Sequence, residues 1–94
     1  MDLRFYIDPE TDQPHMYEHA VTAEEVHEVL TRWGDDFQGT KGSRIRFGQT
    51  LAGRYLKVIY KVDEERDRVF VITAYDLRGK ALKAFRRRQR RKRP

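Results

Sequence analysis

Three residues of the chain, Arg46, Lys57 and Tyr75, supply side chains that can cut RNA without a metal ion. In such a cleavage a base removes the 2′-hydroxyl proton, cations stabilise the phosphorane charge, and an acid protonates the departing 5′-oxygen. Each residue lies in a strand-like segment, and Arg78 follows the last of them. If the strands align in register, we expect these side chains to converge on one face of a sheet. The alternative, which stays open, is that these charged side chains simply form a solvent-exposed face of the sheet and have no function in catalysis.

Residues 15–19 read His-Met-Tyr-Glu-His and match the H-x-x-E-H pattern of a zinc protease. In that pattern two histidines one helical turn apart bind zinc, and the glutamate activates water. The site also needs a third ligand and a cleft framed by a long helix, and a segment directly after Pro14 in a short chain leaves little room for either. We therefore expect His15 to be an ordinary, partly exposed histidine, with no metal and no cofactor, and the role of His19 stays open.

The charges of the chain are unevenly distributed. Residues 1–77 hold ten Lys/Arg and all fifteen Asp/Glu, whereas residues 78–94 hold ten Lys/Arg and no acid, so a net charge of −5 is followed by one of +10. Clustered cations bind polyanions by displacing counterions from phosphates, so we expect RNA as the partner, with DNA as an alternative. Docking of an acidic protein or a solubilising role also stays open. Besides Arg78, the residues expected to bind nucleic acid are Lys80, Lys83, Arg86, Arg87, Arg88, Arg90, Arg91, Lys92 and Arg93.

A chain of 94 residues and 11.3 kDa fits one domain. We place this domain over residues 1–85 and interpret residues 86–94 as an Arg-rich tail, which repulsion among its cations should leave disordered in the free protein. No run approaches the roughly 18 apolar residues of a membrane span, and the amino terminus lacks the apolar stretch of a secretory signal. The absence of cysteine fits a reducing compartment, so we expect a cytoplasmic protein that does not bind membranes.

The pattern of apolar and polar residues predicts an α+β fold in the order β-α-α-β-β-β-α. Thr22 and Glu25 have the spacing of a capping box, and an apolar stripe at helical spacing follows them. Short turns between the last three strands predict an antiparallel meander, with the helices over one apolar face that includes Phe70, Ile72 and Ala74. The predicted strands cover residues 3–8, 44–50, 54–62 and 68–75. The first two predicted helices cover residues 15–20 and 23–33, and a third begins after residue 76. Residues 35–42 form a polar connection.

Four short stretches of the chain, taken in order, carry a family resemblance. They are residues 6–9 (Tyr-Ile-Asp-Pro), residues 19–25 (His-Ala-Val-Thr-Ala-Glu-Glu), residues 46–60 (Arg-Phe-Gly-Gln-Thr running into Gly-Arg-Tyr-Leu-Lys-Val-Ile-Tyr) and residues 69–75 (Val-Phe-Val-Ile-Thr-Ala-Tyr). They resemble the BrnT family of the RelE-like superfamily, which are small toxins of bacterial type II toxin–antitoxin systems. The resemblance implies a RelE-like architecture, endoribonuclease activity and an antitoxin-like protein partner.

The resemblance also assigns roles to particular residues. The family's junction histidine falls on His19, which would exchange protons, and its hairpin arginine falls on Arg44 or Arg46. The family's last-strand arginine falls on Tyr75, so the guanidinium that would hold the scissile phosphate is missing there, and Arg78 would replace it. Tyr75 would instead donate a proton or stack on a base. The sequence thus predicts a toxin-like RNA-binding protein that acts as a metal-independent endoribonuclease; a non-catalytic nucleic-acid-binding module and a protein-interaction domain stay open as alternatives.

Overall fold

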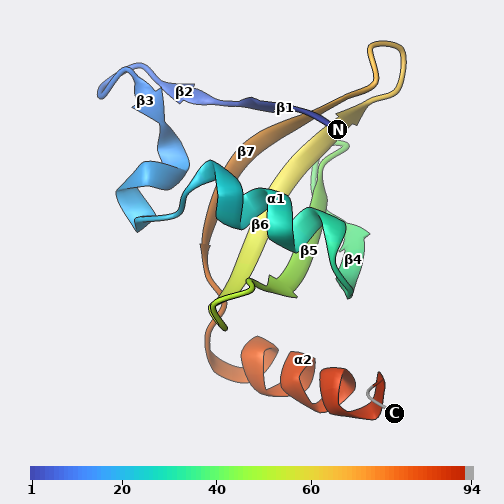
Figure 1. The fold of residues 1–94 in the computed structure, drawn as a ribbon. Coiled ribbons are helices and arrows are strands. Elements are labelled where there is room, and N and C mark those ends of the chain that lie inside the picture. Colours follow the sequence, from blue (N-terminus) through green and yellow to red (C-terminus); the bar gives the residue numbers. More distant parts are fainter. Residues whose placement is uncertain (93–94) are drawn as a thin grey trace.

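The computed structural model describes residues 1–92 and folds them into a mixed five-stranded sheet with two α-helices (Figure 1). The elements are β1 (Asp2–Phe5), β2 (Ile7–Asp8), β3 (Gln13–Pro14), the 3₁₀ helix η1 (His15–His19), α1 (Ala23–Thr31), β4 (Gly34–Gln38), β5 (Arg44–Gln49), β6 (Tyr55–Asp63), β7 (Arg68–Asp76) and α2 (Gly79–Lys92). The sheet has the order β1-β7-β6-β5-β4, and β2 and β3 form a separate ribbon. The α+β class is confirmed. The sheet is not purely antiparallel, however, because β1 pairs with β7 in parallel.

Helix α1 begins at the capping box that the sequence predicts. The Oγ1 atom of Thr22 accepts a hydrogen bond from the backbone N–H of Glu25 at 3.2 Å, and the Glu25 carboxylate accepts one from the backbone N–H of Thr22 at 3.0 Å. These two bonds satisfy amide groups that the start of a helix otherwise leaves unpaired. The helix buries Val26 and Val29 against the sheet. It ends at Thr31, two residues before the predicted end, because the next residue is already extended.

Strand β7 contains a bulge that changes which side chains reach the core. Consecutive residues of β6 pair with Thr73 and Val71, so Ile72 has no partner in the register. An extra residue of this kind shifts the alternation of side chains by one position. Val71 is therefore buried in the core beside α1, and Phe70 is exposed. Unbroken alternation predicts Phe70 on the apolar face of the sheet, and that prediction is wrong.

The edge strand β4 occupies much of the segment that was expected to be a polar connection. The Asp36 carboxylate accepts hydrogen bonds from the hydroxyl of Tyr60 and from Nε of Arg44, the latter at 2.6 Å. The Phe37 ring packs edge-on against Phe47, with ring centres 5.0 Å apart. These partners come from other strands, so the local composition that favoured a loop gave no sign of them.

Helix α2 packs on the sheet face opposite to α1, so the helices do not share one face as the sequence analysis expected. Val58 of β6 lies in the core cluster with α1, whereas Tyr55 packs in a second cluster with Phe85 of α2. These two β6 residues point to opposite faces because side chains alternate along a strand. Phe85 is fully buried, and its ring centre lies 5.4 Å from that of Trp33 and 6.4 Å from that of Phe47. Aromatic side chains on the second face therefore provide a separate docking site for α2.

The arginine-rich segment continues α2, where the sequence analysis expected disorder. Residues 86–92 are helical. The Gln89 side chain accepts a hydrogen bond from the hydroxyl of Tyr55 at 2.9 Å and donates one to the Gln49 side chain at 2.7 Å, which ties the last turns to the sheet. Neither this charged helix nor any other helix within residues 1–92 is long and apolar enough to cross a membrane. Arg93, one of the expected binding residues, lies outside the described residues.

Candidate functional site

Lys57 and Tyr75 lie directly opposite each other on neighbouring strands. They are register partners on β6 and β7, and Nζ of Lys57 lies 5.5 Å from the centre of the Tyr75 ring. A cation at this distance is attracted to the electrons of an aromatic ring. Both side chains are half-buried and lie on the sheet face that also receives α2. The structure thus brings together two of the residues that the sequence analysis selected.

His19 reaches the same place from η1. Its ring centre lies 5.5 Å from that of Tyr75, with the ring planes at 61°. η1 ends after His19 because Ala20 adopts the left-handed conformation, with φ of 56°, and turns the chain towards α1. Met16 and Val21, on either side of this turn, are buried in the core. Burial of these two side chains holds η1 along β7 and keeps the imidazole edge-on to the phenol.

Arg54, which is not among the site residues predicted from the sequence, fixes η1 to the end of β7. Its guanidinium donates hydrogen bonds to acceptors from three other elements. The acceptors are the carbonyl oxygens of His19 (3.0 Å) and Ala20 (2.7 Å) and the carboxylates of Glu25 (3.2 Å) and Asp76 (2.8 Å). The hydrogen bond from Arg54 holds the pKa of Asp76 below its ordinary value, because it favours the charged carboxylate. In the sequence Arg54 is one arginine of a charged hairpin, with no signal that distinguishes it from a surface cation.

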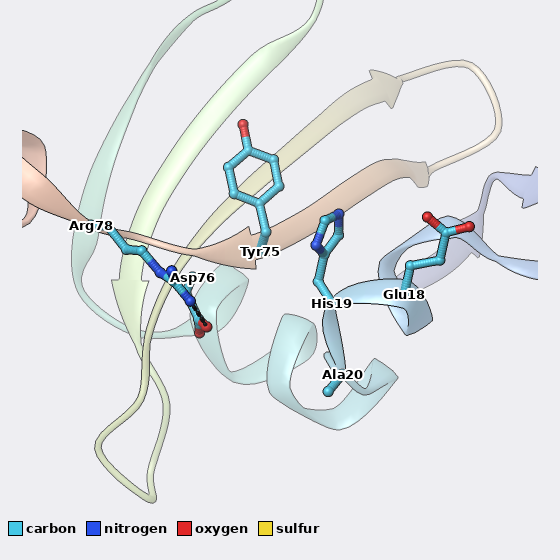
Figure 2. Close-up of a pocket in the computed structure, with 6 residues that line it drawn as sticks. All are labelled: Glu18, His19, Ala20, Tyr75, Asp76 and Arg78. Atoms are coloured by element: carbon cyan, nitrogen blue, oxygen red, sulfur yellow. Dashed lines mark hydrogen bonds and ion pairs between the residues drawn. The ribbon is translucent and has the colours of Figure 1, made fainter.

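His19 and Tyr75 border an open pocket of about 750 Å³, a size typical of small-ligand sites. Figure 2 shows the His19 ring turned towards Tyr75, with Arg78 and Asp76 on the other side of the phenol. Arg78 donates a hydrogen bond to Asp76 at 3.3 Å, and its side chain remains 82% exposed. A bound anion can therefore reach this guanidinium from solvent. The lining residues are Glu18, His19, Ala20, Tyr75, Asp76 and Arg78.

Arg46, which was expected to bind phosphate, lies on the other face of the sheet. Its register partner is Val58, which is buried beside α1. The Arg46 guanidinium donates to the carbonyl oxygens of Val29, at 3.0 Å, and Arg32. Carbonyl groups at the end of a helix lack partners within the helix, so Arg46 serves as a cap for α1. The structure does not bring Arg46 together with Lys57 and Tyr75, because they occupy opposite faces of the sheet.

The cations of α2 form an exposed basic surface that extends away from the pocket. The guanidinium carbon of Arg86 lies 5.8 Å from the centre of the Tyr55 ring, and Tyr55 is two residues from Lys57 on the same face. Arg88 instead forms an ion pair with Asp35 of β4. The exposed cations of this helix are Lys80, Lys83, Arg86, Arg87, Arg88, Arg90, Arg91 and Lys92.

The pocket and the neighbouring Lys57, which does not line it, together supply an imidazole, a phenol and two cations, which can exchange protons and stabilise negative charge. His19 and Tyr75 provide the groups that exchange protons, and Lys57 and Arg78 provide the positive charge. At the edge of the pocket, the lining residue Glu18 lies near two further residues, Asp8 and His15, and one ligand-type atom of each of the three lies within 4.8 Å of the other two.

Comparisons of this chain with models of protein families, with curated proteins and with solved structures found no match. Its function is therefore inferred from the chemistry of the site.

Proposed function

We propose that the protein binds RNA at the pocket beside Tyr75 and cleaves it without a metal ion. One observation carries the proposal: the His19 ring and Nζ of Lys57 each lie 5.5 Å from the centre of the same phenol ring. Groups that exchange protons and groups that stabilise charge are thus within reach of one bound phosphate. The exposed cations of α2 would hold the RNA backbone outside the pocket.

In the proposed reaction the His19 imidazole removes the proton of a ribose 2′-hydroxyl. The 2′-oxygen then attacks phosphorus, the bond from phosphorus to the 5′-oxygen breaks, and the Tyr75 hydroxyl protonates the departing oxygen. Lys57 and Arg78 stabilise the negative charge of the phosphorane. The products are a 2′,3′-cyclic phosphate and a 5′-hydroxyl end.

The toxin-like part of the proposal rests on the family resemblance and on the order of the elements. A strand and two helical segments precede three antiparallel strands and a final helix, which supports the proposal, although the expected order does not contain β2, β3 and β4. His19 lies at the junction between η1 and α1, where the resemblance places a functional histidine. A toxin of this kind arrests the growth of cells that express it.

The experiment compares cleavage of messenger RNA, free and on translating ribosomes, by the wild type, Tyr75→Phe and Lys57→Met. Loss of a positioned acid lowers the rate by about 100-fold or more, so Tyr75→Phe should be nearly inactive. Tyr6→Phe and Lys61→Met, which change exposed side chains outside the pocket, are the matched controls and should cleave normally. The proposed ribonuclease activity would be refuted if the wild type neither cleaved RNA nor arrested growth, or if Tyr75→Phe kept full activity.

A second candidate is a module that binds nucleic acid through α2 without cleaving it. The supporting observation is that Arg87 and Arg91 are exposed and line a small surface pocket of about 230 Å³ with Arg88 and Ala84. Each phosphate contact that is lost should reduce the slope of log affinity against log salt by about 0.7 to 0.9. Arg87→Gln and Arg91→Gln should each do so, whereas Arg66→Gln, in the β6–β7 turn, should not. Unchanged slopes for both α2 variants would exclude α2 as the contact.

A further inference from the structure

Two residues of the H-x-x-E-H segment, His15 and Glu18, lie on one side of η1. This segment is a 3₁₀ helix, in which residues three apart stand one above the other. The Nε2 atom of His15 consequently lies 3.4 Å from Oε2 of Glu18. His19 is turned towards Tyr75 instead, and the Glu18 carboxylate points away from the phenol (Figure 2). The motif therefore pairs one histidine with the glutamate, unlike the two histidines of a zinc protease.

Asp8 brings a second carboxylate to this pair from the β2–β3 ribbon. It is the register partner of Gln13, which precedes His15 by two residues. Its Oδ1 atom accepts a hydrogen bond from the backbone N–H of Glu10 at 2.9 Å, which orients the carboxylate. One ligand atom from each of Asp8, His15 and Glu18 lies within 4.8 Å of the other two. Metal bonds of about 2.1 Å hold ligand atoms at most about 4.2 Å apart, so small side-chain rotations complete a site.

Thr73 of β7 orients His15 for this role. The Nδ1 atom of His15 lies 2.9 Å from Oγ1 of Thr73 in a partly buried hydrogen bond. When Nδ1–H donates to the hydroxyl, the lone pair of Nε2 is free to bind a cation. A hydrogen bond on the second ring nitrogen is the usual support of a metal-binding histidine. This contact comes from outside the cluster and independently directs Nε2 of His15 towards the carboxylates.

We propose that Asp8, His15 and Glu18 bind a divalent transition-metal ion, with Zn²⁺ as the preferred ion. Imidazole and carboxylate together suit Zn²⁺, whereas Mg²⁺ and Ca²⁺ prefer oxygen ligands alone. Three protein ligands leave a fourth position for water. The ion would join the β2–β3 ribbon to η1 and so stabilise the segment that carries His19. This inference goes beyond the proposed cleavage, which requires no ion.

The test is calorimetric titration of the purified, untagged protein with Zn²⁺ and with Mg²⁺, after a chelator has removed bound metal. The wild type should bind one Zn²⁺ per chain and bind Mg²⁺ far more weakly. Asp8→Asn, His15→Gln and Glu18→Gln should each weaken Zn²⁺ binding by at least about tenfold. Thr73→Val, which keeps the shape of the side chain without its hydroxyl, should weaken it by about 10- to 100-fold, and Thr73→Ser should restore it.

The matched controls are Glu24→Gln and His27→Gln, which change exposed residues of α1 outside the cluster and should bind Zn²⁺ as the wild type does. Absence of saturable Zn²⁺ binding, or equal binding by Glu18→Gln and the wild type, overturns the proposal. Glu18 is exposed, so its variant should keep the fold even if His15→Gln does not. Because binding is measured without RNA, and cleavage can be assayed with a chelator present, the two proposals fail or succeed separately.

Discussion

The Nε atom of Arg54 donates a hydrogen bond to Oδ1 of Asp76 at 2.8 Å and so joins the start of β6 to the end of β7. The same guanidinium holds the carbonyl oxygens at the end of η1. The position of His19 relative to Tyr75 therefore depends on a residue that lines no part of the pocket. Arg54 is a positioning residue for the site and a structural link between three elements.

Replacement of Arg54 by lysine should lower the free energy of unfolding by about 2 kcal/mol. Lysine keeps the charge but lacks the planar fork that reaches carbonyl and carboxylate groups together, so hydrogen bonds to charged groups are lost. Urea denaturation measures the change. Arg66→Lys, whose guanidinium forms an exposed ion pair with Asp63, is the matched control and should have little effect. Equal losses in the two variants would contradict the role of Arg54.

Replacement of Gly48 by alanine should lower the free energy of unfolding by about 1–3 kcal/mol. A Cβ atom at Gly48 would lie 2.8 Å from Cγ1 of Val29, closer than carbon atoms pack, so α1 would have to move off β5. Val29→Ala removes that methyl group. The double variant, compared with the two single variants by urea denaturation, should lose less than their sum. Strict additivity would show that the contact does not limit the approach of α1.

Stability should fall at acid pH partly through Asp36. Burial alone would raise the pKa of Asp36, but hydrogen bonds from Tyr60 and Arg44 outweigh it and hold the pKa below its ordinary value. The unfolded chain then takes up this proton at a higher pH than the folded protein. The contribution of Asp36 to the free energy of unfolding is therefore complete above the ordinary aspartate pKa of 3.8. It is lost as the pH falls through the lower pKa that Asp36 has in the folded protein.

The measurement is the free energy of unfolding in urea between about pH 6 and pH 3. Asp36→Asn should show a shallower fall than the wild type, because asparagine does not titrate. Asp12→Asn, at an exposed turn position with positive φ that asparagine tolerates, is the control and should follow the wild type. Parallel curves for Asp36→Asn and the wild type would show that Asp36 does not contribute to this dependence.

Removal of the Phe85 side chain should detach α2 from the sheet. Phe85 is fully buried between Trp33 and Tyr55, so Phe85→Ala should cost about 3–5 kcal/mol by thermal or urea unfolding. Helical circular dichroism should fall as well, because the cations of α2 repel one another without this anchor. Phe70→Ala, at an exposed position on the same sheet, is the control. A loss no larger than that of the control would mean that α2 is held by its polar contacts.

Features set by neighbouring residues were predictable from the sequence. The capping box depends on two residues three apart, and the meander depends on short turns between apolar runs, so both were correct. Lys57 and Tyr75 also met as predicted, because the turn between their strands is short enough to limit the register. The composition of residues 35–42 predicts a loop and gives no sign of β4, because the groups that contact Asp36 and Phe37 lie on other strands.

Which face of the sheet each residue occupies was settled by the folded chain. Side chains alternate along a strand, so the unpaired residue Ile72 places Phe70 outside the core. For the same reason Arg46, whose register partner is Val58, faces the side of the sheet opposite to Lys57. Contacts between elements far apart in the sequence determine which side of the sheet receives α2. Such contacts also bring the four hydrogen-bond acceptors to Arg54. The residue types that can do chemistry are visible in the sequence. Their meeting in one pocket follows from long-range packing, because contacts between distant segments leave no local pattern.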